Sequence, residues 1–418
     1  ETNARVIISL VPLSFSPPSS PPLGDRHEAV MWIAKDLCAL RGHLVAVGDP
    51  LGLAPDRVRA SSCRGDPSVA QNVVGFCSFP QQMRDFLLYR RCRAFPVLME
   101  PSESCRHRPS LLLVIKSRPP HFENRQAIRQ SWGGLRKTGD VTLGRVFLLG
   151  EQGKADHYPD LSRLLAVEQR EFGDLLQWGF RDTFFNLTLK EILFQRWLAE
   201  RCPGPRYIFK GDDDVFVNTD RMLDYVLGLG RRQRRNLFVG DTILDALPSR
   251  DLRQKYYIPR AFYAGSYPPY AGGAGVLFSA DLARRLLWVS AQVPLFPIDD
   301  VYVGMCLSRL GVAPQRHEGF RSFGIAERNK WDVCTYRQLL VVHRRTPHEM
   351  IRLWISIPEG TVEERIIPSK NNNVVTQPTA VFGWSLCAIG CRVSPTKYTV
   401  TTLPVKRFEM SRRRDKAL

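Results

Sequence analysis

Residues 207–217 read Tyr207-Ile208-Phe209-Lys210-Gly211-Asp212-Asp213-Asp214-Val215-Phe216-Val217. A short apolar strand runs into three consecutive aspartates, and a second apolar run follows them. Neighbouring like charges repel, and a hard divalent cation such as Mg²⁺ or Mn²⁺ removes that cost. Alternate side chains of an extended segment point to opposite sides, so Asp212 and Asp214 can face one metal while Asp213 faces away. A solvated acidic turn is the alternative, and the flanking apolar runs disfavour it.

The segments around this motif alternate between strand-like and helix-like patterns. Residues 111–115 form a continuous apolar run, typical of a strand buried on both faces. Further strands are predicted at 145–149 and 276–278, and helices over 124–132, 161–171, 188–201, 281–290 and 297–310. This alternation predicts an α/β domain with a largely parallel sheet. Ligands of such sheets bind beyond the carboxyl ends of the strands, where the aspartates lie.

Composition and charge leave several function classes open. The chain of 418 residues is 44% hydrophobic and 24% charged, which is typical of a globular protein. Its formal net charge of +18 suits nucleic acid, anionic membranes and phosphorylated substrates alike. The sequence has no zinc-finger spacing, aromatic RNA-binding signature or basic helix with heptads. Charge alone therefore does not predict a nucleic-acid-binding protein.

Composition and hydrophobic pattern divide the chain into four segments. Residues 1–62 are predicted to be a stem, a linker or mis-joined sequence, and 63–110 a cysteine-containing lead-in packed on the catalytic domain. The α/β domain spans 111–354, and a divergent tail covers 355–418; both end segments are expected to be poorly ordered. The ten cysteines form no C-x-x-C pair, which favours disulfides in an oxidising compartment over a zinc site, with buried thiols as the alternative. Asn186 begins a glycosylation sequon.

Other polar residues lie where an active site would form. Asp299 and Asp300 open a helix, where aspartate serves equally well as a cap or as a general base. Lys116 and Arg125 follow the first strand and either hold a diphosphate or decorate a helix surface. Gly273 belongs to a glycine run that permits close backbone approach to a ligand or forms an ordinary turn. This run fits neither a dinucleotide fingerprint nor a P-loop.

Six motifs stand in a characteristic order. They are Ile115-Lys116-Ser117, Arg125 to Gly133, Phe184 to Lys190, Lys210 to Val217, Tyr267 to Gly273 and Phe296 to Tyr302. In order and spacing they resemble the β-1,3-glycosyltransferases, above all the β-1,3-N-acetylglucosaminyltransferases that extend poly-N-acetyllactosamine. The resemblance covers residues 63 to 354.

The resemblance implies a GT-A-like (Rossmann-like) single catalytic domain with a mostly parallel mixed sheet flanked by helices. It implies UDP-N-acetylglucosamine as donor, Mn²⁺ or Mg²⁺ as cofactor, and an inverting transfer to the 3-hydroxyl of terminal galactose on a glycan. It also implies a lumenal domain at the Golgi membrane, held by an N-terminal anchor that this sequence does not contain. A homo- or hetero-oligomer stays open, and nucleic acid is not an expected partner.

The same resemblance assigns roles to the acidic residues. Asp214 would hold the metal, and Asp212 would lie near the nucleotide and the metal. Asp300 would be the base, with Asp299 as its neighbour, and Asp213 joins the candidate nucleotide-binding set.

Basic residues and cysteines also receive roles from the resemblance. Lys116, Arg125 and Lys210 would face the nucleotide, and Cys306 and Cys334 would form a disulfide. A further protein ligand of the metal is left open. The alignment places Phe323 at that position, with His317 nearby and His343 further along the chain.

Two other functions compete with GlcNAc transfer. A β-1,3-galactosyltransferase using UDP-galactose shares the acidic motifs. A non-catalytic glycan- or nucleotide-binding module would retain the fold, but the intact Asp212, Asp214 and Asp300 disfavour it.

Overall fold

The computed structural model describes residues 63–357, apart from 103, 106–107, 136, 139–140 and 154–158. All of these residues belong to one compact unit of the chain. The predicted stem, 1–62, and most of the predicted tail lie outside the described residues. Within the described range, no helix is both long enough and apolar enough to cross a membrane.

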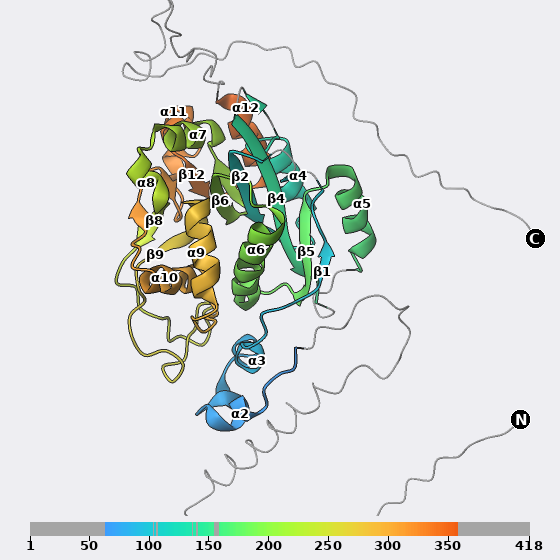
Figure 1. Cartoon of the computed structure of the whole chain (residues 1–418), viewed down its shortest axis with the longest axis vertical. Helices are drawn as coiled ribbons and strands as arrows, with labels where there is room; N and C mark the ends of the chain where they lie inside the picture. Colours follow the sequence, from blue (N-terminus) through green and yellow to red (C-terminus); the bar gives the residue numbers. More distant parts are fainter. Residues whose placement is uncertain are drawn as a thin grey trace, which may run out of the picture. The chain divides into compact units, whose positions relative to one another are not determined.

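A mixed sheet forms the centre of the described part of the chain (Figure 1). Its strand order is β1-β5-β4-β2-β6-β9-β8-β10, and β3 pairs with β4. The strands span Val97–Met99 (β1), Leu111–Lys116 (β2), Lys137–Thr138 (β3), Val141–Glu151 (β4), Leu175–Arg181 (β5), Tyr207–Asp212 (β6), Phe238–Ile243 (β8), Tyr270–Ser279 (β9) and Gln315–Arg316 (β10). Strands β5, β4, β2 and β6 run parallel, and β9 runs antiparallel to β6. The predicted α/β class is confirmed.

A small second sheet has the order β11-β12-β7, with bounds Phe320–Arg321 (β11), Val341–His343 (β12) and Val215–Val217 (β7). Its central strand, β12, runs antiparallel to β7 and parallel to β11. Because β7 directly follows the aspartates, this sheet brings a segment from more than a hundred residues later next to them.

Helices cover the large sheet on both faces. They span Ser68–Asn72 (α2), Gln81–Tyr89 (α3), Phe122–Arg129 (α4), Ser162–Phe172 (α5), Leu187–Arg201 (α6), Thr219–Gly228 (α7), Arg231–Arg235 (α8), Ala280–Ser290 (α9), Asp299–Arg309 (α10), Val333–Gln338 (α11) and Pro347–Ser356 (α12). Short 3-10 turns cover Phe76–Ser78 (η1), Phe184–Asn186 (η2) and Glu327–Asn329 (η3). Figure 1 shows α6 and α9 in front of the sheet.

Alternate residues of β2 enter two separate cores. Leu112 and Val114 pack in the core that α6, α9 and α10 cover. Leu113 and Ile115 pack on the other face with residues of α4, α7, α12 and the small sheet. All four side chains are fully buried. The continuous apolar run at the start of the domain therefore reflects a strand buried on both faces.

The expected helices and strands are present, with ends that differ by a few residues. The sequence pattern did not predict β5 and β8, nor the short strands β1, β3, β10, β11 and β12. Strand β5 contains Gln177 and Gly179, and β8 contains Gly240 and Asp241, which interrupt an apolar or alternating pattern. Burial between neighbouring strands and helices outweighs these weak local preferences.

Two disulfides join pairs of described residues in and around the lead-in segment. Cys63 bonds Cys92 within it, and Cys105 bonds Cys202 just after α6. The prediction of a disulfide between Cys306 and Cys334 is wrong, because these two cysteines are not bonded to each other in the structure. Cys306 lies on the buried side of α10, and burial raises the pKa of its thiol to about 12.

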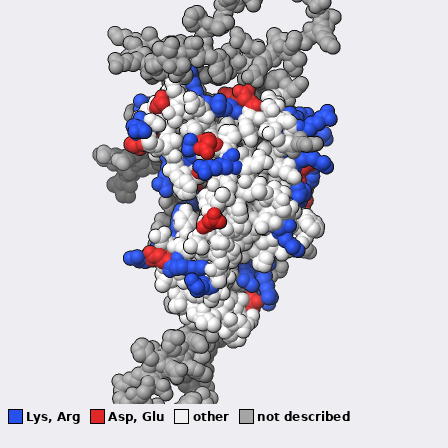
Figure 2. Space-filling model, turned by 90° about the vertical axis from the view of Figure 1, so that its left-hand side faces the viewer, with Lys and Arg blue, Asp and Glu red and all other residues white. Residues whose placement is uncertain are grey.

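The surface charge is divided into small groups on the face shown in Figure 2. Lys and Arg side chains there form several separate clusters, some with Asp or Glu beside them. Among the described residues, Glu318 forms ion pairs with both Arg316 and Arg321.

Candidate active site

The strand order places the candidate residues at one edge of the sheet. The chain builds outward from β2 to β4 and β5, then returns to add β6 on the other side of β2. Parallel sheets bind ligands at such a reversal, beyond the carboxyl ends of the strands. Lys116 ends β2, Asp212 ends β6, and the two are paired in register. The first strand and the acidic motif therefore meet at this edge.

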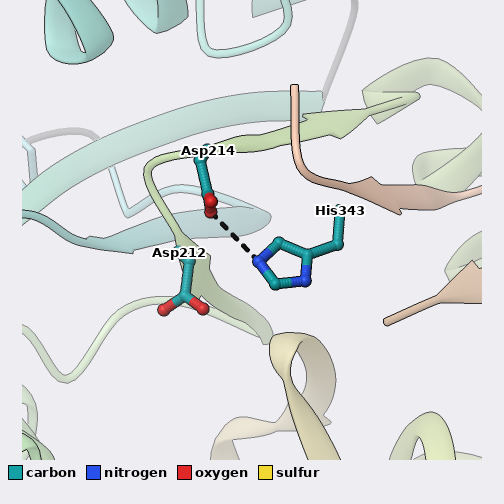
Figure 3. Close-up of side chains that lie close together, drawn as sticks. All are labelled: Asp212, Asp214 and His343. Carbon is teal, nitrogen blue, oxygen red and sulfur yellow. Dashed lines mark ion pairs between the residues drawn. The ribbon is translucent and has the colours of Figure 1, made fainter. Parts of the chain in front are cut away.

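Asp212, Asp214 and His343 form a candidate metal group (Figure 3). One ligand atom from each residue lies within 4.8 Å of those from the other two. The Oδ1 atom of Asp214 is 3.3 Å from Nε2 of His343. Strand β7 carries Asp214 into this position because Val215 pairs with His343 on β12. No other group of this kind occurs among the described residues.

Hydrogen bonding orients the ring of His343 for this role. Its Nδ1 lies 2.7 Å from the backbone carbonyl of Ser322, which can only accept a hydrogen bond. The Nδ1 proton is therefore donated there, and Nε2 faces Asp214, carrying a proton when the ring is charged and a lone pair when it is neutral. Metal-binding histidines in proteins are commonly held by such a bond.

The charges of this group shift one another's protonation. The hydrogen bond that protonated His343 donates to Asp214 raises the pKa of His343 above its ordinary value, against the opposing effect of burial. Burial acts to raise the pKa of Asp214, but His343 and Lys116 outweigh it and the net shift is downward. Burial raises the pKa of Asp212, although Lys116 opposes this. A divalent cation that binds Asp212, Asp214 and His343 would displace the proton from the imidazole of His343.

Lys116 joins the metal group to the start of α10. Its Nζ lies 3.0 Å from Oδ1 of Asp212 and 3.0 Å from Oδ2 of Asp299. Burial acts to lower the pKa of this lysine, but the surrounding carboxylates hold it well above its usual range. Lys116 therefore remains charged and holds Asp299 ionised.

Asp300 is held differently from its neighbour. Burial and the charge of Asp299 raise the pKa of Asp300 to about 8, against the opposing charge of Lys116. The carboxylate lies against Gly273 on β9, where an added Cβ would be only 2.7 Å from Oδ1. The glycine run is thus part of a strand, and Gly273 leaves the room that Asp300 occupies. A carboxyl group whose pKa is near the working pH suits a general base.

Asp213 turns away from the other two aspartates. Its carboxylate accepts a hydrogen bond from Ser117 Oγ at 2.6 Å and lies 2.8 Å from His121 Nδ1. Asn124 also donates to the backbone carbonyl of Asp213. Asp213 therefore fastens the acidic turn to the loop between β2 and α4. Sequence reasoning placed Ser117 in the first of the six motifs without giving it a role, and it missed His121, whose only signal was its position after the first strand.

Two of the basic residues expected to face the nucleotide lie in the interior instead. Arg125 is fully buried, and its guanidinium binds both carboxylate oxygens of Glu168, at 2.8 and 2.7 Å. Lys210 is buried and pairs with Glu191 on α6. Buried charges require such partners, and these pairs leave Arg125 no exposed donor for a phosphate. Of the three basic candidates, only Lys116 reaches the acidic site.

Of the three candidates for the remaining metal ligand, His317, Phe323 and His343, the structure places only one beside the aspartates. The ring of His317 packs on Tyr225, and its Nδ1 accepts a hydrogen bond from the backbone of Gly319. Phe323 is 76% exposed and offers no ligand atom. Only His343 joins the two aspartates.

The glycosylation sequon begins at the N-cap of α6. The Asn186 amide is half-buried and donates to the carbonyl of Arg181 at 2.8 Å. Thr188 is buried and donates to Phe296. Modification of Asn186 stays a prediction, and it would have to precede folding of this helix.

Comparison with known proteins gives a consistent result. A model of the galactosyltransferase family matches residues 123–318. The chain is 50% identical over 304 residues to N-acetyllactosaminide beta-1,3-N-acetylglucosaminyltransferase 2 of Mus musculus, covering 73% of this chain and 77% of that protein. It is 51% identical over 292 residues to the Homo sapiens protein of that name, covering 70% and 74%.

One further relative and one solved structure complete the comparison. The chain is 43% identical over 314 residues to a Homo sapiens acetylgalactosaminyl-O-glycosyl-glycoprotein beta-1,3-N-acetylglucosaminyltransferase, covering 72% of this chain and 81% of that protein. Among solved structures, the apo-form glycosyltransferase GlyE of Streptococcus pneumoniae aligns with a TM-score of 0.29 and 12% identity, covering 57% and 55%. The fold assignment rests on the strand order described above.

Proposed function

The chain belongs to the family of β-1,3-N-acetylglucosaminyltransferases, and we propose that it moves N-acetylglucosamine from UDP-GlcNAc to the 3-hydroxyl of terminal galactose on a glycan. The observation that carries this proposal is the meeting of Asp212, Asp214 and His343 with Lys116 and the Asp299–Asp300 pair at one sheet edge.

The donor atoms of the metal group fit Mn²⁺ or Mg²⁺. Asp212 and Asp214 supply carboxylate oxygens, and His343 supplies an imidazole nitrogen. Three protein ligands leave coordination positions open, as expected for a cation that also binds phosphate oxygens of a nucleotide. The cation would neutralise negative charge on the departing diphosphate.

The residues of the chain divide the remaining work. Asp300 takes the proton of the acceptor hydroxyl. At the same time the hydroxyl oxygen bonds to the sugar carbon of the donor, and the bond between that carbon and the diphosphate breaks. Gly273 keeps room for the Asp300 carboxylate. Lys116 stays protonated between Asp212 and Asp299, so it lowers the electrostatic cost of gathering carboxylates beside a diphosphate. One base on the face opposite the leaving group is consistent with inversion.

A donor and acceptor assay tests the proposal. The purified protein is incubated with UDP-GlcNAc or UDP-galactose, each with a lactosamine and a GlcNAc acceptor, with Mn²⁺ present. GlcNAc transfer to lactosamine is expected. Product from UDP-galactose alone would establish the galactosyltransferase instead, and no product from either donor would favour a non-catalytic binding module.

We further propose a Golgi location for the enzyme, with the described domain in the lumen. The disulfides Cys63–Cys92 and Cys105–Cys202 are consistent with an oxidising compartment. Membrane attachment through an N-terminal anchor and assembly into a homo- or hetero-oligomer stay predictions.

A further inference from the structure

The outward side of α9 carries a stripe of polar and aromatic side chains. Asp281, Arg284, Arg285 and Trp288 recur at spacings of three and four residues, and all four are exposed. The opposite side of the same helix packs into the core. The Trp288 side chain is 66% exposed, which leaves a large aromatic surface in water without a structural use.

Neighbouring elements turn this stripe into a hollow of about 740 Å³. It is lined by Arg235, Asn236, Asp281, Arg284, Arg285, Trp288 and Leu310. Arg285 donates to the side-chain oxygen of Asn236 at 2.5 Å, which fixes α9 to the end of α8, and Arg284 pairs with Asp281. Three arginines against one aspartate leave the lining basic. Both helices appear on the left-hand side of Figure 1.

We propose that this hollow binds a sulfated oligosaccharide. One face of a sugar ring presents C–H groups that pack on an indole as apolar surface does, and Trp288 offers such a face. Guanidinium groups bind oxyanions through paired hydrogen bonds, and a sulfate ester remains charged at every physiological pH. The volume lies in the range of pockets that hold small ligands. A peptide made only of Asp and Glu would satisfy the arginines, but it has no ring that can pack on the indole.

The hollow is separate from the candidate active site. None of its lining residues belongs to the metal group or to the Asp299–Asp300 pair. Strand β9 begins near Asp300, whereas its last residue, Ser279, pairs with Tyr207 at the far end of β6. Helix α9 starts from that far end. The proposal therefore stands independently of the transferase activity.

Titration calorimetry with the full chain tests this binding in about 0.15 M salt, where exposed charges are partly screened. The probes are a sulfated N-acetyllactosamine tetrasaccharide, its desulfated form and an octaglutamate peptide. Trp288→Ala and the double variant Arg284→Ser/Arg285→Ser are compared with wild type. Matched controls are Trp331→Ala, at a half-exposed tryptophan, and Arg90→Ser/Arg91→Ser, an adjacent exposed pair that does not line the hollow. Thermal melting verifies that each variant is folded.

The sulfated probe should bind wild type and both controls equally, and about tenfold or more weaker to each hollow variant. The desulfated probe should bind more weakly than the sulfated one to wild type. Undiminished binding in Arg284→Ser/Arg285→Ser would overturn the proposal, because the sugar would then occupy another site. Binding of octaglutamate that equals the sulfated probe and survives Trp288→Ala would also overturn it in favour of an acidic peptide.

Discussion

At the scale of single residues, Asp300 carries the sharpest prediction. Asp300→Asn removes the base, so transfer should fall by roughly a hundredfold or more while UDP binding stays nearly intact. The carboxyl has a pKa of about 8 in the folded protein and an ordinary low value when unfolded. The folded state therefore binds the proton more tightly, and this contribution to stability is lost as the pH rises toward and through 8.

Thermal melting in EDTA measures that loss directly. Asp300→Asn should melt together with wild type near pH 4, where both side chains are neutral. Near pH 9 the variant should melt higher by about 2–4 °C or more, because only the wild type carries the buried charge. If wild type and Asp300→Asn had the same melting temperature at both pH values, the Asp300 carboxyl would ionise as freely in the folded protein as in the unfolded chain.

His343 carries a second prediction at this scale. Metal must displace the proton that Asp214 helps to hold on the imidazole, so Mn²⁺ binding should release a proton and weaken as the pH falls through the raised pKa. Calorimetry in buffers of different ionisation enthalpy reports this release. His343→Gln should abolish it and weaken binding about tenfold or more. His317→Gln is the control, and equal weakening by both variants would remove His343 from the metal group.

At the scale of elements, the fit between β9 and α10 positions the base. Gly273→Ala places a Cβ 2.7 Å from Oδ1 of Asp300, so the carboxylate must move. A displacement of about 1 Å in a catalytic group costs roughly a hundredfold in rate. The expected result is a comparable fall in kcat/KM. Gly265→Ala, which meets nothing within 4 Å, is the matched control and should retain activity. Full activity of Gly273→Ala would show that β9 does not position Asp300.

At the scale of the whole molecule, disulfides join segments distant in sequence. Cys105–Cys202 closes 97 residues, whereas Cys63–Cys92 closes 29. Loop entropy predicts a loss of about 4.7 kcal/mol in the free energy of unfolding for Cys105→Ala/Cys202→Ala, and about 3.6 kcal/mol for Cys63→Ala/Cys92→Ala. Urea unfolding measures both. The opposite order would mean that local packing of the lead-in, rather than chain entropy, sets its stability.

Much of this arrangement is predictable from local pattern. The apolar run of β2 and the strand entering Asp212 predict the parallel centre of the sheet, because burial on two faces leaves a continuous apolar signature. Three adjacent aspartates at a strand end predict a cation, since their repulsion needs a compensating charge. The spacing also separates Asp213 from Asp212 and Asp214. These inferences depend only on neighbours in the chain.

Pairing between distant segments decided the rest. His343 joins Asp214 because β12 pairs with β7, and no local pattern distinguishes it from His317. Tertiary packing buries Arg125 against Glu168 and keeps Cys306 from Cys334. The sequence by itself determined the buried faces of the elements that it predicted and the chemistry at the end of β6. Only the tertiary structure decided which remote side chains complete that site, because periodicity records burial and not the identity of the partner.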